Sequence, residues 1–170
     1  MFWKKKKIMN STFGEIVYYG TGWRTVEKLS VSLFGKTFSV YVLARAKKDL
    51  NEAISDLQES ALTSFEDLIA SKKSQLEETI TNYLNRVSSI YDYNCRYHEG
   101  YNLGDIPSRF VPHLIEITRK GECAIYVGDD AEEYGEYDDW DEGFVVTIIP
   151  EIQIYSKELY VDYICGGGTL

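Results

Sequence analysis

The spacing of apolar residues changes along the chain from a two-residue alternation to a helical repeat and back, and this change constrains the fold most. Apolar and polar side chains alternate over 24–34 and 38–44, as in half-buried strands. Over 50–91 the apolar residues recur every three or four positions, as in an amphipathic helix. Alternation returns after residue 112. The order strands, helices, strands predicts an α+β fold, with a mostly antiparallel sheet and the helices packed on one face.

The first third predicts a three-stranded antiparallel meander, with strands at 13–19, 24–34 and 38–44. Within the second strand the alternation slips at Lys28, which indicates a bulge or a bend.

The helical region is too long for one helix. An unbroken helix over 50–91 would be about 63 Å long, whereas a compact domain of this size is about 40 Å across. We therefore expect a helix pair or one kinked helix, with the break in the polar tract at 71–74. Asp49 is placed to cap the first helix, and Ser74 with Glu77 has the spacing of a capping box.

The last third predicts a second group of strands and no boundary to a second domain. The expected strands are 113–118, 122–127, 144–149, 152–155 and 159–164. We expect a single domain over 1–170, with a flexible basic arm at 1–12 and a flexible tail at 166–170.

Negative charge is concentrated in one stretch. The chain has 27 acidic and 18 basic residues, for a net charge of −9. Residues 129–142, which we call the acidic segment, hold nine acids and no base, and elsewhere acids and bases balance at 18 each. Such a segment repels a nucleic-acid backbone. It attracts a basic protein, chiefly by raising the association rate.

Three aromatic side chains are interleaved with these acids. Rings beside carboxylates can stack on the arginines of a basic partner while the acids pair with them. The candidate partner-binding residues are Glu132, Glu133, Tyr134, Tyr137, Asp138, Asp139, Trp140, Asp141 and Glu142. A solvated surface hairpin with Trp140 folded back onto the sheet explains the same residues equally well.

Motifs for catalysis or cofactor binding are scarce. Cys95 and His98 form one C-x-x-H pair, and His113 and Cys123 could add ligands, but zinc sites usually show two tightly spaced pairs. No glycine-rich turn leads into a helix, and the acidic segment lacks the spacing of an EF-hand loop. The sequence therefore predicts no catalytic residue, no metal ligand and no cofactor, and it favours a protein that is not an enzyme.

The chain's compartment is predicted from its cysteines and its N-terminus. Three cysteines without a C-x-x-C pair are typical of reduced thiols. Lys4–Lys7 are followed by only two apolar residues, which is too few for a signal peptide. No apolar stretch reaches the length of a membrane span. A cytoplasmic protein is expected.

The stretch Asp138–Val146, which follows the strand Cys123–Val127, resembles a family of uncharacterised bacterial domains in which a Trp-Asp-Glu motif opens a late strand. That family also carries a helix with a Gln/Ala/Phe pattern, which Gln58, Ala61 and Phe65 match, and a helix end like Ile90–Tyr91. The usual motif continues Glu-His-Gly, whereas Gly143 follows Glu142 directly here. The resemblance implies an immunity-like protein encoded near polymorphic toxins, and it assigns no role to any residue.

Three hypotheses remain. The leading one is a non-catalytic protein-binding module, such as an immunity protein that neutralises a basic toxin through the acidic segment. The alternative is a small-ligand-binding protein or an enzyme with a pocket between sheet and helices, using Cys95, His98 and acids of the segment. The third is a homodimer formed through a tyrosine-rich, uncovered sheet face.

Overall fold

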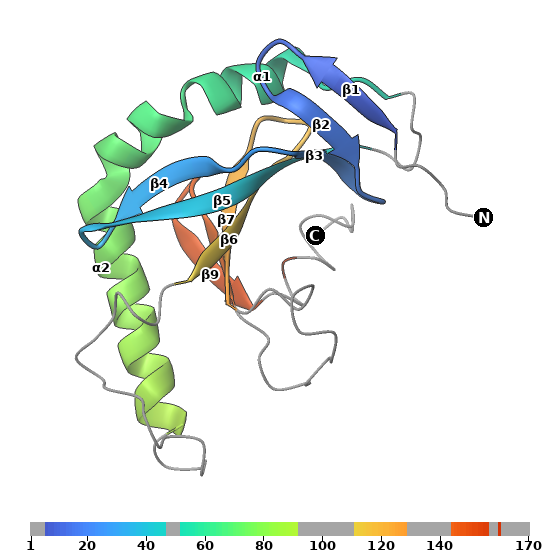
Figure 1. The fold of residues 1–170 in the computed structure, drawn as a ribbon. Helices are drawn as coiled ribbons and strands as arrows, with labels where there is room; N and C mark the ends of the chain where they lie inside the picture. The colour runs from blue at the N-terminus through green and yellow to red at the C-terminus, as the bar shows by residue number, and fades with distance from the viewer. Residues whose placement is uncertain (1–5, 47–51, 92–110, 129–143, 157–159, 161–170) are drawn as a thin grey trace.

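The computed structural model describes residues 6–46, 52–91, 111–128, 144–156 and 160. These residues form a nine-stranded, mostly antiparallel sheet with two helices on one side, so the expected α+β fold is confirmed (Figure 1). The elements are β1 (Lys7–Asn10), β2 (Gly14–Tyr18), β3 (Gly22–Thr25), β4 (Leu29–Leu33), β5 (Lys36–Arg45), α1 (Asp56–Thr63), α2 (Phe65–Tyr91), β6 (Pro112–Ile117), β7 (Cys123–Val127), β8 (Phe144–Thr147) and β9 (Gln153–Ser156).

The strands lie side by side in the order β1-β2-β3-β5-β6-β7-β8-β9, and β4 also pairs with β5. β5 and β6 are parallel, and every other described pair is antiparallel. Parallel neighbours need a long crossover connection. The two helices lie in this connection, and in Figure 1 they follow one another in an arc along one side of the sheet.

The N-terminal strands confirm the bend at Lys28 and correct the expected arm. The predicted strand over 24–34 is divided into β3 and β4, which pair with different parts of β5. Part of the segment expected to be a flexible arm forms β1, in which Ile8 pairs with Ile16 of β2. The later strands β6 to β9 lie where the sequence predicts them. The strand expected over 159–164 lies outside the described residues apart from Tyr160.

The helix boundaries differ from the predicted ones. The first helix is capped by Ser55 rather than by Asp49, and Ser55 forms a reciprocal capping box with Gln58. The break between the helices falls at Ser64, which caps the C-terminus of α1, rather than at 71–74.

The tract 71–74 stays helical because the apolar stripe keeps its phase across it. Ile69 and Leu76 are seven residues apart, which is close to two helical turns, so both face the sheet. The polar side chains between them also find partners that are compatible with a helix. Ser71 Oγ donates to the Leu68 carbonyl at 2.9 Å, and Lys73 Nζ lies 3.9 Å from Glu77 Oε1 one turn further on.

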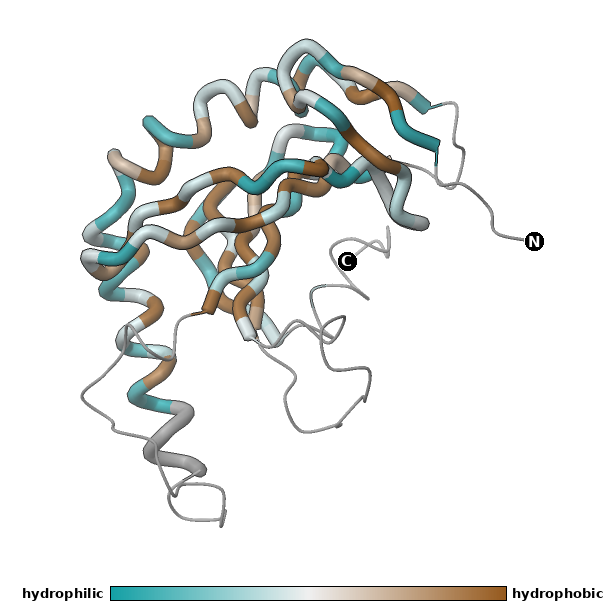
Figure 2. The backbone as a smooth tube through the Cα atoms, viewed as in Figure 1, coloured by the Kyte–Doolittle hydropathy of each residue, from teal (hydrophilic) through white to brown (hydrophobic). Residues whose placement is uncertain are grey.

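The core lies between the helices and one face of the sheet, which we call the helix face. Figure 2 shows hydrophobic residues concentrated in the central strands, whereas α2 alternates between hydrophobic and hydrophilic residues along its length. The α2 residues that enter the core are Phe65, Ile69, Leu76, Ile80 and Leu84. Within the described ranges, neither helix is apolar enough over a sufficient length to span a bilayer.

Candidate functional site

The acidic segment joins two strands that pair with each other. Val127 at the end of β7 faces Phe144 at the start of β8 in antiparallel register, and both are buried. The nine candidate partner-binding residues lie outside the described residues, as do Cys95, His98 and Cys165. The two strands nevertheless hold both ends of the insertion side by side.

The first anchor of the segment is held by β6 and the residue before it. The Gly128 amide donates to the carbonyl of Val111 at 3.0 Å, and the Gly128 carbonyl accepts from Nδ1 of His113 at 3.1 Å. The His113 ring also packs edge-on against Tyr126, with 6.3 Å between the ring centroids. His113 thus supports the residue next to Asp129.

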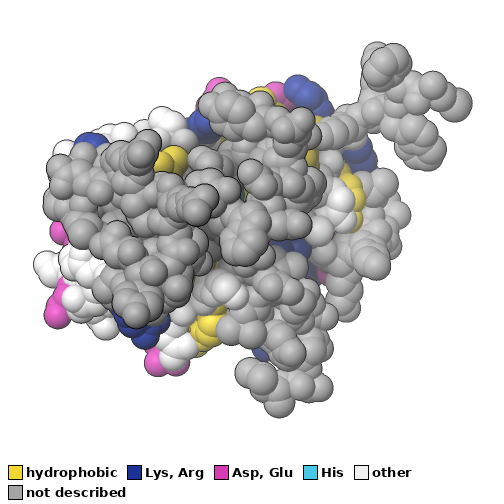
Figure 3. Space-filling model, turned by 90° about the horizontal axis from the view of Figure 1, so that it is seen from below, with side chains coloured by type: hydrophobic (Ala, Val, Ile, Leu, Met, Phe, Trp, Pro, Cys, Tyr) yellow, Lys and Arg dark blue, Asp and Glu magenta, His cyan; other side chains and the backbone are white. Residues whose placement is uncertain are grey.

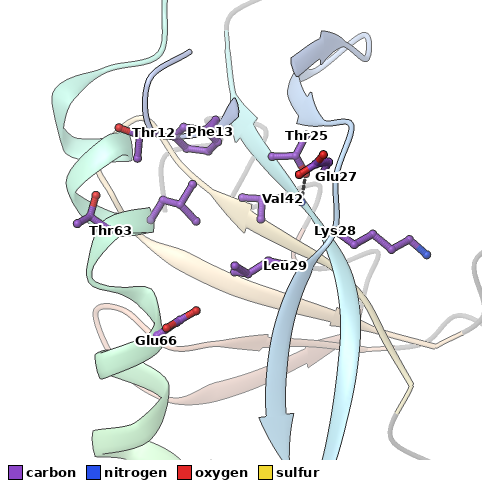
Figure 4. Close-up of a pocket in the computed structure, with 10 residues that line it drawn as sticks. Thr12, Phe13, Thr25, Glu27, Lys28, Leu29, Val42, Thr63 and Glu66 are labelled. Atoms are coloured by element: carbon purple, nitrogen blue, oxygen red, sulfur yellow. Dashed lines mark hydrogen bonds between the residues drawn. The ribbon is translucent and has the colours of Figure 1, made fainter. Parts of the chain in front are cut away.

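A cavity of about 360 Å³ lies between the sheet and the helices, and we call it the sheet–helix cleft (Figure 4). The turn between β1 and β2, the link between β3 and β4, strand β5 and the α1–α2 junction contribute its lining. The turn is held by Asn10, whose Oδ1 accepts from the amides of Thr12 and Phe13 at 2.8 Å each. Asn10 Nδ2 donates to Glu59 Oε1 at 2.8 Å and so fixes the turn on α1.

The cleft has an apolar floor. Phe13 and Val42 are buried, and Leu29 and Leu62 pack partly buried against the same core. Thr25 is buried beside them, and its hydroxyl accepts from the Val42 amide at 3.0 Å. The Thr25 hydroxyl oxygen therefore has one hydrogen-bond partner within the sheet.

Two carboxylates lie at the cleft on different elements. Glu27 comes from the link between β3 and β4, and Glu66 comes from the first turn of α2 (Figure 4). Both are exposed, and neither makes an ion pair or hydrogen bond with another described residue. Lys28 also lines the cleft, but its side chain extends away from the centre (Figure 4). Its Nζ lies 4.7 Å from the ring centroid of Tyr41.

The opposite face of the sheet, which we call the second face, carries a buried ion pair. Arg45 Nε lies 2.8 Å from Glu116 Oε2, and the Tyr126 hydroxyl donates to the same oxygen at 3.0 Å. Glu116 is fully buried, and Tyr126 packs edge-on against the buried ring of Tyr160. Tyr126 and Tyr160 therefore do not line an exposed tyrosine face, which the dimer hypothesis expected.

Further along the second face, a cation lies between two rings. The Arg24 guanidinium is 3.8 Å from the centroid of Tyr19 and 4.4 Å from that of Tyr41. Stacking on aromatic faces is a favourable arrangement for a guanidinium. In the view from below, described Lys, Arg, Asp and Glu side chains lie interspersed rather than in separate fields (Figure 3).

The described candidates for metal and nucleophile chemistry are separated. Among the described residues, no three His, Cys, Asp or Glu side chains gather as a metal site would require. Burial in the apolar core raises the pKa of the Cys123 thiol to about 12. A thiol that stays protonated near neutral pH is a poor nucleophile and a poor metal ligand.

The helix residues that carry the family resemblance are structural. Gln58 is fully buried, and its Nε2 donates to the carbonyls of Arg45 and Ile117 at 2.8 and 3.0 Å. It thus links the ends of the parallel strands β5 and β6 to α1. Ala61 and Phe65 are buried in the core on the same side of the sheet. The Trp-Asp-Glu motif itself lies outside the described residues.

Sequence reasoning proposed a pocket between sheet and helices, but it identified neither the residues of the cleft nor the second-face ion pair. The cleft residues come from four separate chain segments, so no short motif could reveal them. Glu116 did leave a signal, because it is a charged residue between two isoleucines at the end of a strand.

Comparison with known proteins assigns no relationship to this arrangement. No model of a protein family matches the chain, and neither a curated protein nor a solved structure matches it significantly.

Proposed function

We propose that this protein is a non-catalytic binding module that docks a basic protein through its acidic segment. In the specific form of the proposal it is an immunity protein, and the partner is a basic toxin such as a nuclease. The observation that carries the proposal is the insertion of a segment with nine acids and no base between two paired, buried strand ends.

The strand pairing supports binding because it limits how far the two ends of the segment can separate. Val127 and Phe144 are register partners in the sheet, and Gly128 is tied to β6. A recognition segment with tethered ends loses less conformational entropy on binding than one on a free terminus. In this proposal the sheet acts as a scaffold for the recognition segment, which is a common arrangement in binding proteins.

The charge distribution supports a basic partner. Since the rest of the chain is neutral in formal charge, the field of the molecule is dominated by the acidic segment. Such a field accelerates the encounter with a positive surface, and added salt weakens it. In the proposed mechanism the carboxylates mimic the phosphates of the toxin's substrate and bind the basic groups that would hold them. Trp140 anchors the contact.

The test compares two variants with the same change in net charge. The site variant carries Asp138→Asn, Asp139→Asn, Asp141→Asn and Glu142→Gln. The control carries Asp56→Asn, Asp67→Asn, Glu78→Gln and Glu151→Gln, four exposed residues outside the segment. Each protein is used as bait for a source-cell lysate at low salt, and the captured partner is then purified.

The association rate constant of the purified partner is measured by stopped flow at several salt concentrations. We expect at least a tenfold slower association for the site variant, with a shallower salt dependence, and no such change for the control. Equal rates for all three proteins would contradict the role of the segment. Co-expression with the partner tests the immunity form, because the wild type should restore growth and the site variant should not.

The sheet–helix cleft favours a second candidate function, the binding of a small ligand. A cavity of about 360 Å³ with an apolar floor falls within the size range of small-molecule sites. Its place between sheet and helices supports this candidate, although its described lining differs from the residues that the sequence hypothesis named for the pocket. Saturable binding of a small molecule to the cleft, without effect of the four substitutions in the acidic segment, would favour this function.

A further inference from the structure

We propose that the sheet–helix cleft binds a small organic cation, namely an amine or guanidinium attached to an apolar body. This inference rests on the second candidate function and adds the chemical class of the ligand. It follows from how the cleft separates apolar surface from charge.

The apolar body is assigned to the floor of the cleft. Phe13, Leu29, Val42 and Leu62 supply ring and aliphatic surface there, and the nearby Thr25 hydroxyl is already engaged by the Val42 amide. A polar ligand group placed against these four apolar side chains would lose water without finding a polar partner among them. An apolar group placed there would gain contact area at no such cost.

The cation is assigned to the rim because both carboxylates lie there. Glu27 and Glu66 line the cleft from separate elements (Figure 4). Neither has a hydrogen-bond or ion-pair partner among the described residues, so a ligand need not displace one. Two carboxylates at one cavity raise the local concentration of cations and disfavour anions.

Lys28, the one basic residue among the described residues of the lining, does not cancel this field at the cleft. The ammonium of Lys28 lies over the ring of Tyr41. Tyr41 alternates along β5 with Val40 and Val42, which are both in the core of the helix face. Since neighbouring residues of a strand point to opposite faces, Tyr41 and the Lys28 charge belong to the second face. The cleft therefore selects positive charge.

The test uses three probes that share a phenyl group and a two-carbon chain. These are 2-phenylethylamine, which is a cation at pH 7, the neutral 2-phenylethanol, and the anion phenylacetate. Each is titrated into the full-length ¹⁵N-labelled protein, and amide chemical shifts are followed at the cleft. The variants are Glu27→Gln with Glu66→Gln and, as a control of equal charge change, Asp67→Asn with Glu78→Gln. All four residues are exposed, so each variant should keep the dispersed spectrum of the folded protein.

We expect the amine to change the chemical shifts of the cleft amides saturably. Its apparent affinity should be at least tenfold weaker for the cleft variant and unchanged for the control variant. The alcohol should bind at least tenfold more weakly than the amine. Equal binding of alcohol and amine, or an undiminished affinity in the cleft variant, overturns the assignment of a cation but leaves small-ligand binding standing. Absence of saturable shifts with all three probes overturns both.

Discussion

The two faces of the sheet are built from alternate residues of the same strands, yet they differ in chemistry. Along the helix face, one register row consists of Val42, Ile115, Ile125, Val146 and Ile154, all apolar. The adjacent register row, which lies on the second face, consists of Leu43, Glu116, Ala124, Thr147 and Gln153. The helix-face row is thus wholly apolar, whereas the second-face row includes polar and charged side chains, although both rows contain buried residues.

The difference shows two ways to bury a strand. Apolar side chains on the helix face need only shape and volume to match, because dispersion and the hydrophobic effect are not directional. On the second face, Glu116 requires Arg45 and Tyr126 at specific positions. A buried carboxylate without such partners would be strongly destabilising. Substitutions on the helix face should therefore destabilise the protein chiefly by removing side-chain volume. Substitutions on the second face should do so chiefly by removing hydrogen-bond or ion-pair partners.

The largest effect is expected from removing volume on the helix face. Ile115→Ala should lower the free energy of unfolding by about 3–4 kcal/mol, because Ile115 is fully buried and leaves a cavity. Leu114→Ala, on the adjacent and only partly buried residue, should cost about 1–2 kcal/mol. Denaturation by urea measures both, and equal losses would remove the proposed difference between the faces.

The next effect tests the buried ion pair. Glu116→Gln should cost about 2–3 kcal/mol, because it leaves the half-buried Arg45 without its counter-charge. Replacing both partners with Glu116→Leu and Arg45→Met should recover most of that loss. The cycle is completed by the single variants Glu116→Leu and Arg45→Met, and additive losses in urea denaturation would mean that the two side chains are not coupled.

A polar exception on the helix side sharpens the comparison. Gln58→Ala should cost about 2 kcal/mol, because the carbonyls of Arg45 and Ile117 lose their donor in a buried place. Ser55→Ala, which removes only the capping hydroxyl, should cost about 1 kcal/mol. Thermal unfolding of the two variants ranks them, and a smaller loss for the Gln58 variant would contradict its role as the link between strands and helix.

The smallest effect concerns charge on the apolar face. The pKa of Cys123 rises from 9.0 to about 12 on folding, so the unfolded chain loses this proton first as pH rises. The contribution of the protonated thiol to the free energy of unfolding is complete below pH 9 and is lost between pH 9 and 12. The free energy of unfolding falls over this range by no more than about 1.4 kcal/mol per pH unit. Unfolding of Cys123→Ala between pH 8 and 10 should show a shallower decline than wild type. Identical slopes would indicate that the folded protein ionises this thiol normally.

Much of the fold could be predicted because local spacing reports which side of an element is buried. The alternation over 38–44 and the helical stripe that includes Ile69, Leu76 and Ile80 each carry their own evidence. The bend at Lys28 was also visible, since a shift of phase reverses which residues face the core. The break at Ser64 was missed because the polar tract at 71–74 is the more conspicuous interruption, while the apolar phase continues through it.

The candidate sites divide in the same way. The acidic segment is a property of the sequence alone, because nine like charges need no fold to be recognised. The sheet–helix cleft and the pair formed by Arg45 and Glu116 required the tertiary structure. Arg45 and Glu116 meet only after the chain crosses over through the two helices and aligns β5 with β6 in parallel. The cleft residues meet when α1 and the start of α2 pack beside the N-terminal strands.

The sequence by itself determined the class of most described elements, the α+β order and the place of the charge excess. Only the tertiary structure decided the parallel pairing of β5 with β6, the incorporation of β1 at the sheet edge, and the burial of Glu116. The physical reason is the range of the forces involved. Spacing and local charge depend on neighbours in the chain, whereas strand order and buried partners depend on contacts between residues far apart in sequence.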